Sequence, residues 1–402
     1  MNQVINRSLS DRFADRTSVF GVSIWTDIFR MMELHEDPVY FGDGAPAREM
    51  LPIDRMAQAS QRVWSDAFGA MGYGDQRGYE PLRELIANHV ARRGIETTAD
   101  NVIVTSGSTQ ALDLACRVLL EPGDAVIVEN PTFLGTLEIL ATYQVDVIGV
   151  DCDDDGMLMD HLQETLEANP NVKIVYTIPT FQNPTGTSLP QDRRERMVEL
   201  AAEHNVAIFE DDPYGDLQYS GEVLAPIRAI SDQVLHFGTF SKTLAPGIRV
   251  GYVIAPEEVS AAILSTREVS DISNDRIMMR TVTEALKDDY LIGHIQECRD
   301  FYRARRDVML AALEREMPEG IHWSKPDGGF FVWITLPDHI DGQEMFRISA
   351  EHGVVVFPGK WFDPTGEVSH TIRLSFSTVP EDRIDLGIKR LGAAIRSVLY
   401  PR

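Results

Sequence analysis

The chain has 402 residues, 44% of them hydrophobic and 25% charged, a composition typical of a globular protein with a sizeable core. Its formal net charge of −25 argues against binding to nucleic acid or to an anionic membrane, because bound phosphates need clustered lysine and arginine. We expect neither a signal segment nor a membrane span. Cys116, Cys152 and Cys298 follow no disulfide or metal-ligand spacing, so the sequence predicts a cytoplasmic protein without a metal site.

The first fifty residues show no strong periodicity. An extended piece, Pro38–Phe41, runs into a loop that contains Gly42 and Gly44. These glycines would let the backbone approach a ligand closely, although a plain turn explains them equally well. Residues 79–93 predict an amphipathic helix, and Tyr73 lies shortly before it.

From Asn101 onward, apolar strands alternate with helical segments, which is the rhythm of a mainly parallel sheet. The expected strands are NVIVTS, AVIVE, KIVYTIP, VAIFE, VLHFGTF and VGYVIA. In such sheets ligands bind in the loops at the carboxyl ends of the strands. Candidate binding residues follow several of these strands.

Two of these loops offer groups suited to a phosphorylated aromatic ligand. Gly107-Ser108-Thr109-Gln110 opens a helix whose free N–H groups favour an anion, although an ordinary Ser/Thr helix cap explains the segment as well. Phe133, in the loop after AVIVE, is placed either to stack on a ring or to pack in the interior.

Two further loops carry an amide and an acid. Asn183 lies in an NPTG turn, where turn chemistry alone would also explain the residue. Asp211 comes directly after the strand VAIFE, with Tyr214 three residues later. A buried carboxylate requires a partner such as a protonated pyridine nitrogen, whereas a solvated loop would need none.

The segment TFSKTLAPGIRVGY, from Thr239 to Tyr252, carries the main chemical signal. Lys242 is one of only six lysines, against thirty-one arginines, and lies between two predicted strands, Val234–Phe237 and Ile248–Ala255. A partly desolvated lysine has a depressed pKa and can form an imine with an aldehyde. Thr239, Ser241 and Arg249 would bind a phosphate, so the segment indicates pyridoxal 5'-phosphate (PLP); a surface turn lysine is the alternative.

The last hundred residues predict a smaller α+β domain. A long helix begins near Asp289, and strands follow at GGFFVW, VVVFPG and HTIRLSFS. In the last strand, alternation places Arg373 on the face opposite the apolar side chains, where it could bind a carboxylate or a surface acid. We predict an N-terminal arm and part of the small domain over residues 1–50, a large PLP-binding domain over 51–295 and a small C-terminal domain over 296–402.

Together, GSTQ, ENPTF, NPTG, EDDPYGDL, SKTLAPGIRVGY, GGFFVW and TIRLSFS resemble, in order and spacing, the fold-type I PLP-dependent aminotransferases of class I/II. FGDGAPAREMLP and YGDQRGYEPLRE are most similar to the subgroup of 2-aminoadipate and kynurenine aminotransferases. The resemblance implies an α/β fold with a mainly parallel seven-stranded sheet in the large domain and a smaller α+β domain. It also implies a homodimer with shared active sites, which moves the amino group of an L-amino acid to a 2-oxo acid by a ping-pong mechanism.

The resemblance also implies roles for single residues. Lys242 would hold the cofactor as an imine and move the substrate's Cα proton, while Asp211 would keep the ring nitrogen protonated. Tyr214 and Asn183 would bind the ring oxygen, and Phe133 would stack on the ring. The implied phosphate-binding residues are Ser108, Thr109, Thr239, Ser241 and Arg249, with Tyr73 supplied to the neighbouring subunit.

The implied substrate site contains Arg373, which would bind the α-carboxylate, together with Asn183 and Gly44. One position departs from the subgroup: Thr26 stands where many members have an arginine, in the segment Ser23-Ile24-Trp25-Thr26. This departure favours an uncharged substrate side chain over an acidic one.

Two alternatives remain at this stage. Another PLP reaction on the same scaffold, such as β- or γ-elimination or a biosynthetic cyclisation, would use the same residues. The ligand-sensing domain of a transcription regulator is the less favoured alternative, because only about fifty residues precede the predicted large domain and the net charge is unsuited to DNA.

Overall fold

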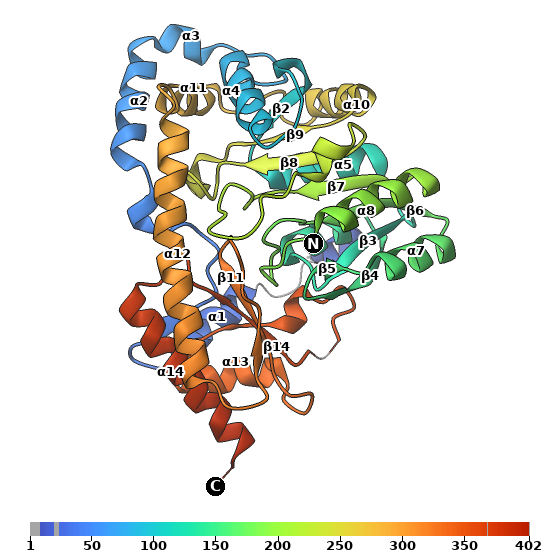
Figure 1. Cartoon of the computed structure of the whole chain (residues 1–402). Coiled ribbons are helices and arrows are strands. Elements are labelled where there is room, and N and C mark those ends of the chain that lie inside the picture. Colours follow the sequence, from blue (N-terminus) through green and yellow to red (C-terminus); the bar gives the residue numbers. More distant parts are fainter. Residues whose placement is uncertain (1–8, 20–23, 368, 402) are drawn as a thin grey trace, which may run out of the picture.

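The computed structural model describes residues 9–19, 24–367 and 369–401. Figure 1 shows a larger α/β part built around a central sheet and a smaller part below it, with the long helix α12 (Tyr290–Glu316) running along both. Ser23 lies outside the described residues. None of the described helices has the length and apolar character that crossing a bilayer requires.

The central sheet is mainly parallel, as the sequence predicts. Among the described residues its strand order is β2-β9-β8-β7-β6-β3-β4-β5, with β9 antiparallel to both neighbours and β5 antiparallel to β4. The strands are β2 (Val102–Thr105), β3 (Ala125–Asn130), β4 (Asp146–Asp153), β5 (Gly156–Met157), β6 (Val172–Thr177), β7 (Ala207–Asp211), β8 (Leu235–Thr239) and β9 (Gly251–Ile254). The eighth strand, beyond the seven expected, is the two-residue β5.

Two strand predictions need correction. Strand β4 was not among the expected strands: the apolar stretch in its sequence, DVIGVDCD, is short and bordered by acids, and Val150 is its only buried residue. The strand expected from Ile248 begins three residues later, at Gly251. Ile248 instead ends a short 3-10 helix, and Arg249 takes a left-handed conformation with φ of 51°, which interrupts extended structure before β9.

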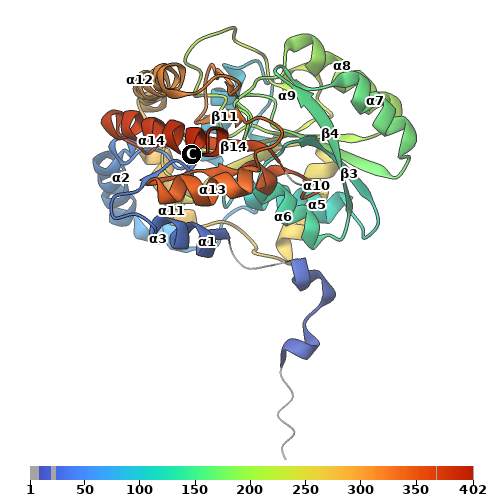
Figure 2. The same ribbon diagram turned by 90° about the horizontal axis from the view of Figure 1, so that it is seen from below.

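Helices cover both faces of the sheet (Figure 2). On one face, α5 (Ser108–Leu119), α6 (Leu134–Thr142) and α10 (Glu257–Glu268) pack on side chains such as Ile103, Val128 and Phe209. The other face is covered by α4 (Glu80–Ala91), α7 (Met159–Ala168), α8 (Gln191–His204), α9 (Ile227–Ile230) and α11 (Arg276–Ala285). Helix α4 confirms the amphipathic helix expected over residues 79–93, with Leu82, Ile86 and Val90 buried.

The smaller part is an antiparallel sheet of order β10-β11-β14-β13 with helices against it. Its elements are β10 (His322–Trp323), β11 (Phe331–Thr335), α13 (Gly342–Glu351), β12 (Val354–Val355), β13 (Phe357–Pro358), β14 (Thr371–Ser375) and α14 (Glu381–Leu399). The N-terminal segment joins it, because β1 (Val39–Tyr40) pairs in parallel with β12. The remaining helices are α1 (Ile24–Met32), α2 (Ile53–Ser65) and α3 (Ala67–Met71).

Helix α12 contributes to the cores of both parts. Leu291 and Ile295 pack with the residues of α4 and β9, whereas Cys298 and Tyr302 pack with those of β11 and β14. The proposed division between residues 295 and 296 falls at this change of partners. We retain it as a prediction.

Candidate active site

A cavity of about 690 Å³ lies where the carboxyl ends of β2, β3, β6, β7 and β8 meet residues of the smaller part. Twelve of the residues that the sequence singled out line it: Gly44, Ser108, Thr109, Phe133, Asn183, Asp211, Tyr214, Thr239, Ser241, Lys242, Arg249 and Arg373. The parallel sheet explains this convergence, since equivalent strand ends lie along one edge.

Lys242 follows β8 and points into the cavity wall. Its Nζ donates a hydrogen bond to the Gly44 carbonyl oxygen at 2.8 Å and lies 5.7 Å from the centroid of the Tyr214 ring. Burial lowers the pKa of Lys242 to about 8, and Asp43 offsets this effect only in part. A substantial fraction of the amine is therefore neutral, and nucleophilic, just above neutral pH.

Asp211 ends β7 on the cavity side. Its Oδ2 accepts a hydrogen bond from the Tyr176 hydroxyl at 2.9 Å, and burial raises its pKa to about 6. Its Oδ1 is buried and has no hydrogen-bond partner among the described residues. A buried carboxylate oxygen without a donor is costly, so this atom is suited to receive a hydrogen bond from a protonated ring nitrogen.

Hydroxyl groups, a guanidinium group and a helix N-terminus come together at one end of the cavity. Ser108 begins the twelve-residue α5, and the Thr239 hydroxyl donates to Ser241 Oγ at 2.9 Å. The Arg249 guanidinium donates to the Ser106 carbonyl oxygen at 2.9 Å and lies against Gly107, where any Cβ would collide with it. This end of the cavity is suited to a phosphate.

Arg373 comes from β14 of the smaller part and lies among aromatic rings. It donates to Asn183 Oδ1 at 2.8 Å and to the Gly42 carbonyl oxygen at 2.6 Å, while its buried Nε has no hydrogen-bond partner in the described part of the chain. Its guanidinium carbon is within 5 Å of three ring centroids, those of Phe331, Phe357 and Phe362. Burial lowers the pKa of Arg373 to about 10, so it remains a cation at neutral pH and is suited to a carboxylate.

The two remaining aromatic candidates form part of the cavity wall. Phe133 is half-buried at the start of α6. Tyr214 is buried, and its ring meets that of Phe331 edge-on with centroids 5.7 Å apart. Burial raises the pKa of the Tyr214 hydroxyl well above its usual range, so it remains a hydrogen-bond donor.

Two predicted residues do not line the cavity. Thr26 is exposed on α1, although its neighbours Ile24 and Trp25 do line the cavity. The Tyr73 side chain is 87% exposed, which accords with a residue expected to serve the neighbouring subunit. The roles of both residues remain predictions.

Several cavity residues were missed from the sequence. Asp43, Leu134, Glu138, Ile178, Phe331, Phe357 and Phe362 line the cavity, and Tyr176 holds Asp211. The apolar residues of this set lie in hydrophobic stretches of sequence that predict ordinary core packing. Of these residues, Asp43 could most easily have been predicted from the sequence, because it lies between Gly42 and Gly44 in the loop already considered as a ligand contact.

The family model "Aminotransferase class I and II" matches residues 37–391. The chain belongs to the class I and II aminotransferases. This confirms the expected fold class and, with it, an enzyme that transfers amino groups.

Named aminotransferases match over nearly the whole chain. Aromatic-amino-acid aminotransferase 1 of Thermococcus litoralis is 39% identical, over 96% of this chain and 94% of the relative. The crystal structure of kynurenine aminotransferase from Pyrococcus horikoshii, in complex with PMP, is 37% identical and superposes with a TM-score of 0.92 over 98% of both chains. An α-aminoadipate aminotransferase from Thermus thermophilus, complexed with N-(5'-phosphopyridoxyl)-L-leucine, is 29% identical with a TM-score of 0.90, over 98% of this chain and 99% of the other.

The cofactor of this aminotransferase is PLP, and the residues present fit it. The unpartnered Oδ1 of Asp211 suits the ring nitrogen, and the amine of Lys242 suits the aldehyde. The phosphate end is the group formed by Ser108, Thr239, Ser241 and Arg249. When bound, PLP supplies an aldehyde that joins to amines and a ring that accepts the electrons released at Cα.

Proposed function

We propose that this aminotransferase takes the amino group from L-amino acids with aromatic or aliphatic side chains and passes it to a 2-oxo acid by a ping-pong mechanism. The observation that carries the proposal is the composition of the cavity wall. Apolar side chains dominate it: Ile24, Trp25, Leu134, Phe331, Phe357 and Phe362. The name of the 39%-identical relative, an aromatic-amino-acid aminotransferase, supports the same class of donor.

The roles that we assign to the positive charges in the cavity argue against an acidic substrate side chain. Among the described lining residues the basic ones are Lys242, Arg249 and Arg373. In our proposal they serve the cofactor aldehyde, its phosphate and the substrate α-carboxylate, so no cation remains for a distal carboxylate. Glu138 and Asp43 also line the cavity and would repel one.

Each of the site residues has a separate role in the proposed reaction. Arg373 binds the α-carboxylate and thereby sets the direction of the Cα–H bond, with Asn183 and Gly42 holding the guanidinium in place. Lys242 would take the proton from Cα and deliver it to the former aldehyde carbon of the cofactor within the same half-reaction, and it would carry out the reverse transfer in the second half-reaction. Asp211 would hold a proton on the ring nitrogen, and Phe133, Tyr214 and Asn183 would contact the ring.

We further propose that the enzyme is a homodimer with shared active sites. The surface formed by α2, α3 and the following loop exposes large apolar side chains, among them Trp64, Phe68 and Met71. Phe68 is 98% exposed, and contiguous apolar surface of this kind typically marks a protein interface. A second copy covering this surface would bring its Tyr73 toward the phosphate end. The free thiols of all three cysteines support a reducing, cytoplasmic location.

The test is a titration of the PLP-loaded protein with single amino acids, followed by absorbance. We expect L-phenylalanine and L-leucine to convert the cofactor spectrum from the aldehyde to the amine form, and 2-oxoglutarate or pyruvate to reverse the change. L-Glutamate and L-2-aminoadipate should convert it at least tenfold less efficiently as donors. Preference for the acidic donors would overturn the substrate class, and ammonia release with a regenerated aldehyde spectrum would indicate elimination instead.

A matched variant tests the role of Arg373. Arg373→Lys keeps the positive charge but loses the forked guanidinium geometry. The half-saturation concentration for L-phenylalanine should therefore rise roughly tenfold to a hundredfold, which corresponds to a loss of about 1.4–2.8 kcal/mol of binding free energy. The affinity for PLP should stay unchanged, because Arg373 is not one of the proposed phosphate-binding residues. An unchanged half-saturation concentration would remove Arg373 from substrate binding.

A further inference from the structure

Three consecutive acidic residues are buried at the end of β7, next to the cofactor site. Glu210, Asp211 and Asp212 are all below one-tenth exposed. Burying a carboxylate is unfavourable unless hydrogen bonds or an opposite charge compensate for lost water. Asp211 is assigned above to the ring nitrogen, so the other two acids must be compensated by other groups for Asp211 to stay ionised.

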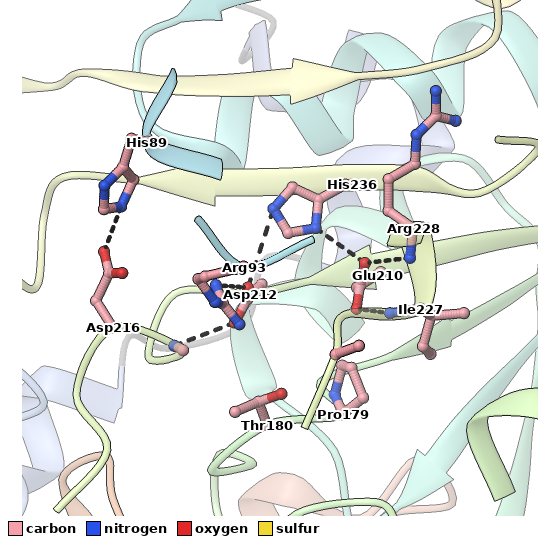
Figure 3. A network of polar contacts seen from close by, with 12 residues as sticks. His89, Arg93, Pro179, Thr180, Glu210, Asp212, Asp216, Ile227, Arg228 and His236 are labelled. Atoms are coloured by element: carbon pink, nitrogen blue, oxygen red, sulfur yellow. Dashed lines mark hydrogen bonds and ion pairs between the residues drawn. The ribbon is translucent and has the colours of Figure 1, made fainter. Parts of the chain in front are cut away.

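Hydrogen bonds to both oxygens of Glu210 compensate for the burial of its carboxylate. It accepts hydrogen bonds from the backbone N–H groups of Ile227 at 2.6 Å and Arg228 at 3.0 Å, and it contacts His236 Nδ1 at 2.9 Å (Figure 3). Although burial alone would raise the pKa of Glu210, these contacts bring it below the usual value. An ionised carboxylate only accepts, so His236 Nδ1 carries the hydrogen and Nε2 faces Asp212 Oδ2 at 3.9 Å.

Asp212 is paired directly with the guanidinium group of Arg93. Its Oδ2 forms a short ion pair with Arg93 Nη1, and its Oδ1 accepts from the Gly215 N–H at 3.1 Å (Figure 3). The Arg93 guanidinium lies so close to Gly215 that any Cβ there would collide with it. A glycine at 215 is therefore what lets the arginine reach Asp212. Burial would lower the pKa of Arg93, but Asp212 and Asp216 raise it, so the guanidinium stays charged.

We propose that Arg93 is a positioning residue for the cofactor: by balancing the charge of Asp212, it keeps Asp211 ionised and able to hold the proton on the ring nitrogen. The inference rests on the proposed role of Asp211. Arg93 itself lies just beyond the end of α4 and does not line the active-site cavity, so we assign its effect on Asp211 to its pairing with Asp212.

The charges around Asp211 support this assignment. Burial is the main cause that raises the pKa of Asp211, the Tyr176 hydrogen bond lowers it, and the charge of Asp212 raises it again. His236 and Lys242 lower it, and the other titratable groups near it are Glu129 and Tyr214. With a pKa of about 6, Asp211 is close to the point at which an unbalanced neighbouring charge would leave it protonated at neutral pH.

The test measures cofactor binding, without any amino-acid substrate. PLP affinity of the cofactor-free protein is measured from pH 5 to 8, and the ring nitrogen is observed by NMR with ¹⁵N-labelled PLP. In the wild type, affinity should fall as the pH drops through about 6, because Asp211 becomes protonated. In Arg93→Met we expect this midpoint to rise by about one pH unit or more, and the labelled nitrogen to lose its proton at neutral pH.

Three variants separate the charge effect from a structural one. Arg92→Met, at an exposed arginine whose ion-pair partner is Asp289 at 3.6 Å, should behave as the wild type. Arg93→Met with Asp212→Asn removes both charges and should restore the midpoint and the nitrogen signal. Asp212→Asn alone leaves Arg93 unbalanced and should lower the midpoint, a prediction that stands even if Arg93→Met fails to fold.

An Arg93→Met protein that is folded by circular dichroism and keeps the wild-type midpoint and nitrogen signal would overturn the inference. So would a double variant that stays as impaired as Arg93→Met, or an unchanged midpoint in Asp212→Asn. A wild-type protein whose ring nitrogen is unprotonated would instead contradict the proposed role of Asp211, so the two failures are distinguishable.

Discussion

At the scale of single residues, Lys242 shows how burial produces reactivity. A lysine at the protein surface is almost entirely protonated near neutral pH and is a poor nucleophile. Here burial lowers the pKa to about 8, and the Gly44 carbonyl oxygen holds the amine in the cavity. Burial also leaves one oxygen of the Asp211 carboxylate without a partner among the residues that the structure describes, so one physical cause prepares both groups that the cofactor needs.

The depressed pKa predicts a pH dependence. The neutral amine is the reactive form, so the rate at which the cofactor-free protein forms its imine with PLP should rise about tenfold per pH unit below 8 and level off above it. Stopped-flow absorbance between pH 6 and 9 measures this rate. Lys242→Ala should still bind PLP but show no imine absorbance and no turnover; a rate independent of pH would contradict the assignment of Lys242.

At the scale of elements, the start of α5 forms the phosphate end through one glycine. Gly107 has φ of 79° and passes directly under the Arg249 guanidinium, and Arg249 itself is left-handed with φ of 51°. Both conformations are unusual, and together they place the helix N-terminus beside the guanidinium. The anion site therefore depends on backbone geometry as well as on hydroxyl groups.

Gly107→Ala should weaken PLP binding by about tenfold or more, because the added Cβ would displace Arg249, and should also lower stability by about 1–2 kcal/mol through the unfavourable φ. The matched control is Gly123→Ala. Gly123 has φ of 91° with no atom of the described residues near its Cβ position. The Gly123→Ala protein should therefore lose a similar amount of stability and keep the wild-type affinity for PLP. Equal affinity losses in both variants, measured by fluorescence titration, would refute the role of the Gly107 contact.

At the scale of the whole molecule, the exposed apolar surface of α2 and α3 lies far from the C-terminus (Figure 1). Phe68 is the most exposed large hydrophobic residue among those described, and Tyr73 follows it shortly afterwards in the chain. If this surface is the dimer interface, assembly and cofactor binding are coupled, because Tyr73 of each subunit would contact the cofactor phosphate in the other.

Phe68→Arg should shift the protein from dimer to monomer in sedimentation velocity and weaken PLP binding, because an unpaired charge would be buried in the interface. Tyr400→Arg, at an exposed aromatic residue near the C-terminus, should change neither property. Tyr73→Phe should leave the dimer intact and weaken PLP binding by about tenfold, the loss of one hydrogen bond to a charged group. A Phe68→Arg protein that remains dimeric would place the interface elsewhere.

The residues placed at strand ends could be predicted from the sequence, because a parallel sheet brings the carboxyl ends of its strands to one edge. This is why Lys242, Asp211, Asn183 and Ser108 line one cavity although they are far apart in the chain. The same periodicity predicted the strands that are buried on both faces. It failed for β4, whose side chains are mostly exposed or half-buried.

Only the tertiary structure decided which side chains support those residues. Tyr176 beside Asp211, Phe331 against Arg373, and Arg93 against Asp212 each meet partners more than thirty residues away. Their local sequences read as ordinary strand, core or helix end, because a side chain's chemistry alone does not specify its distant neighbour. The sequence by itself determined the chemical groups and the edge on which they meet, whereas long-range packing determined their charge states and geometry.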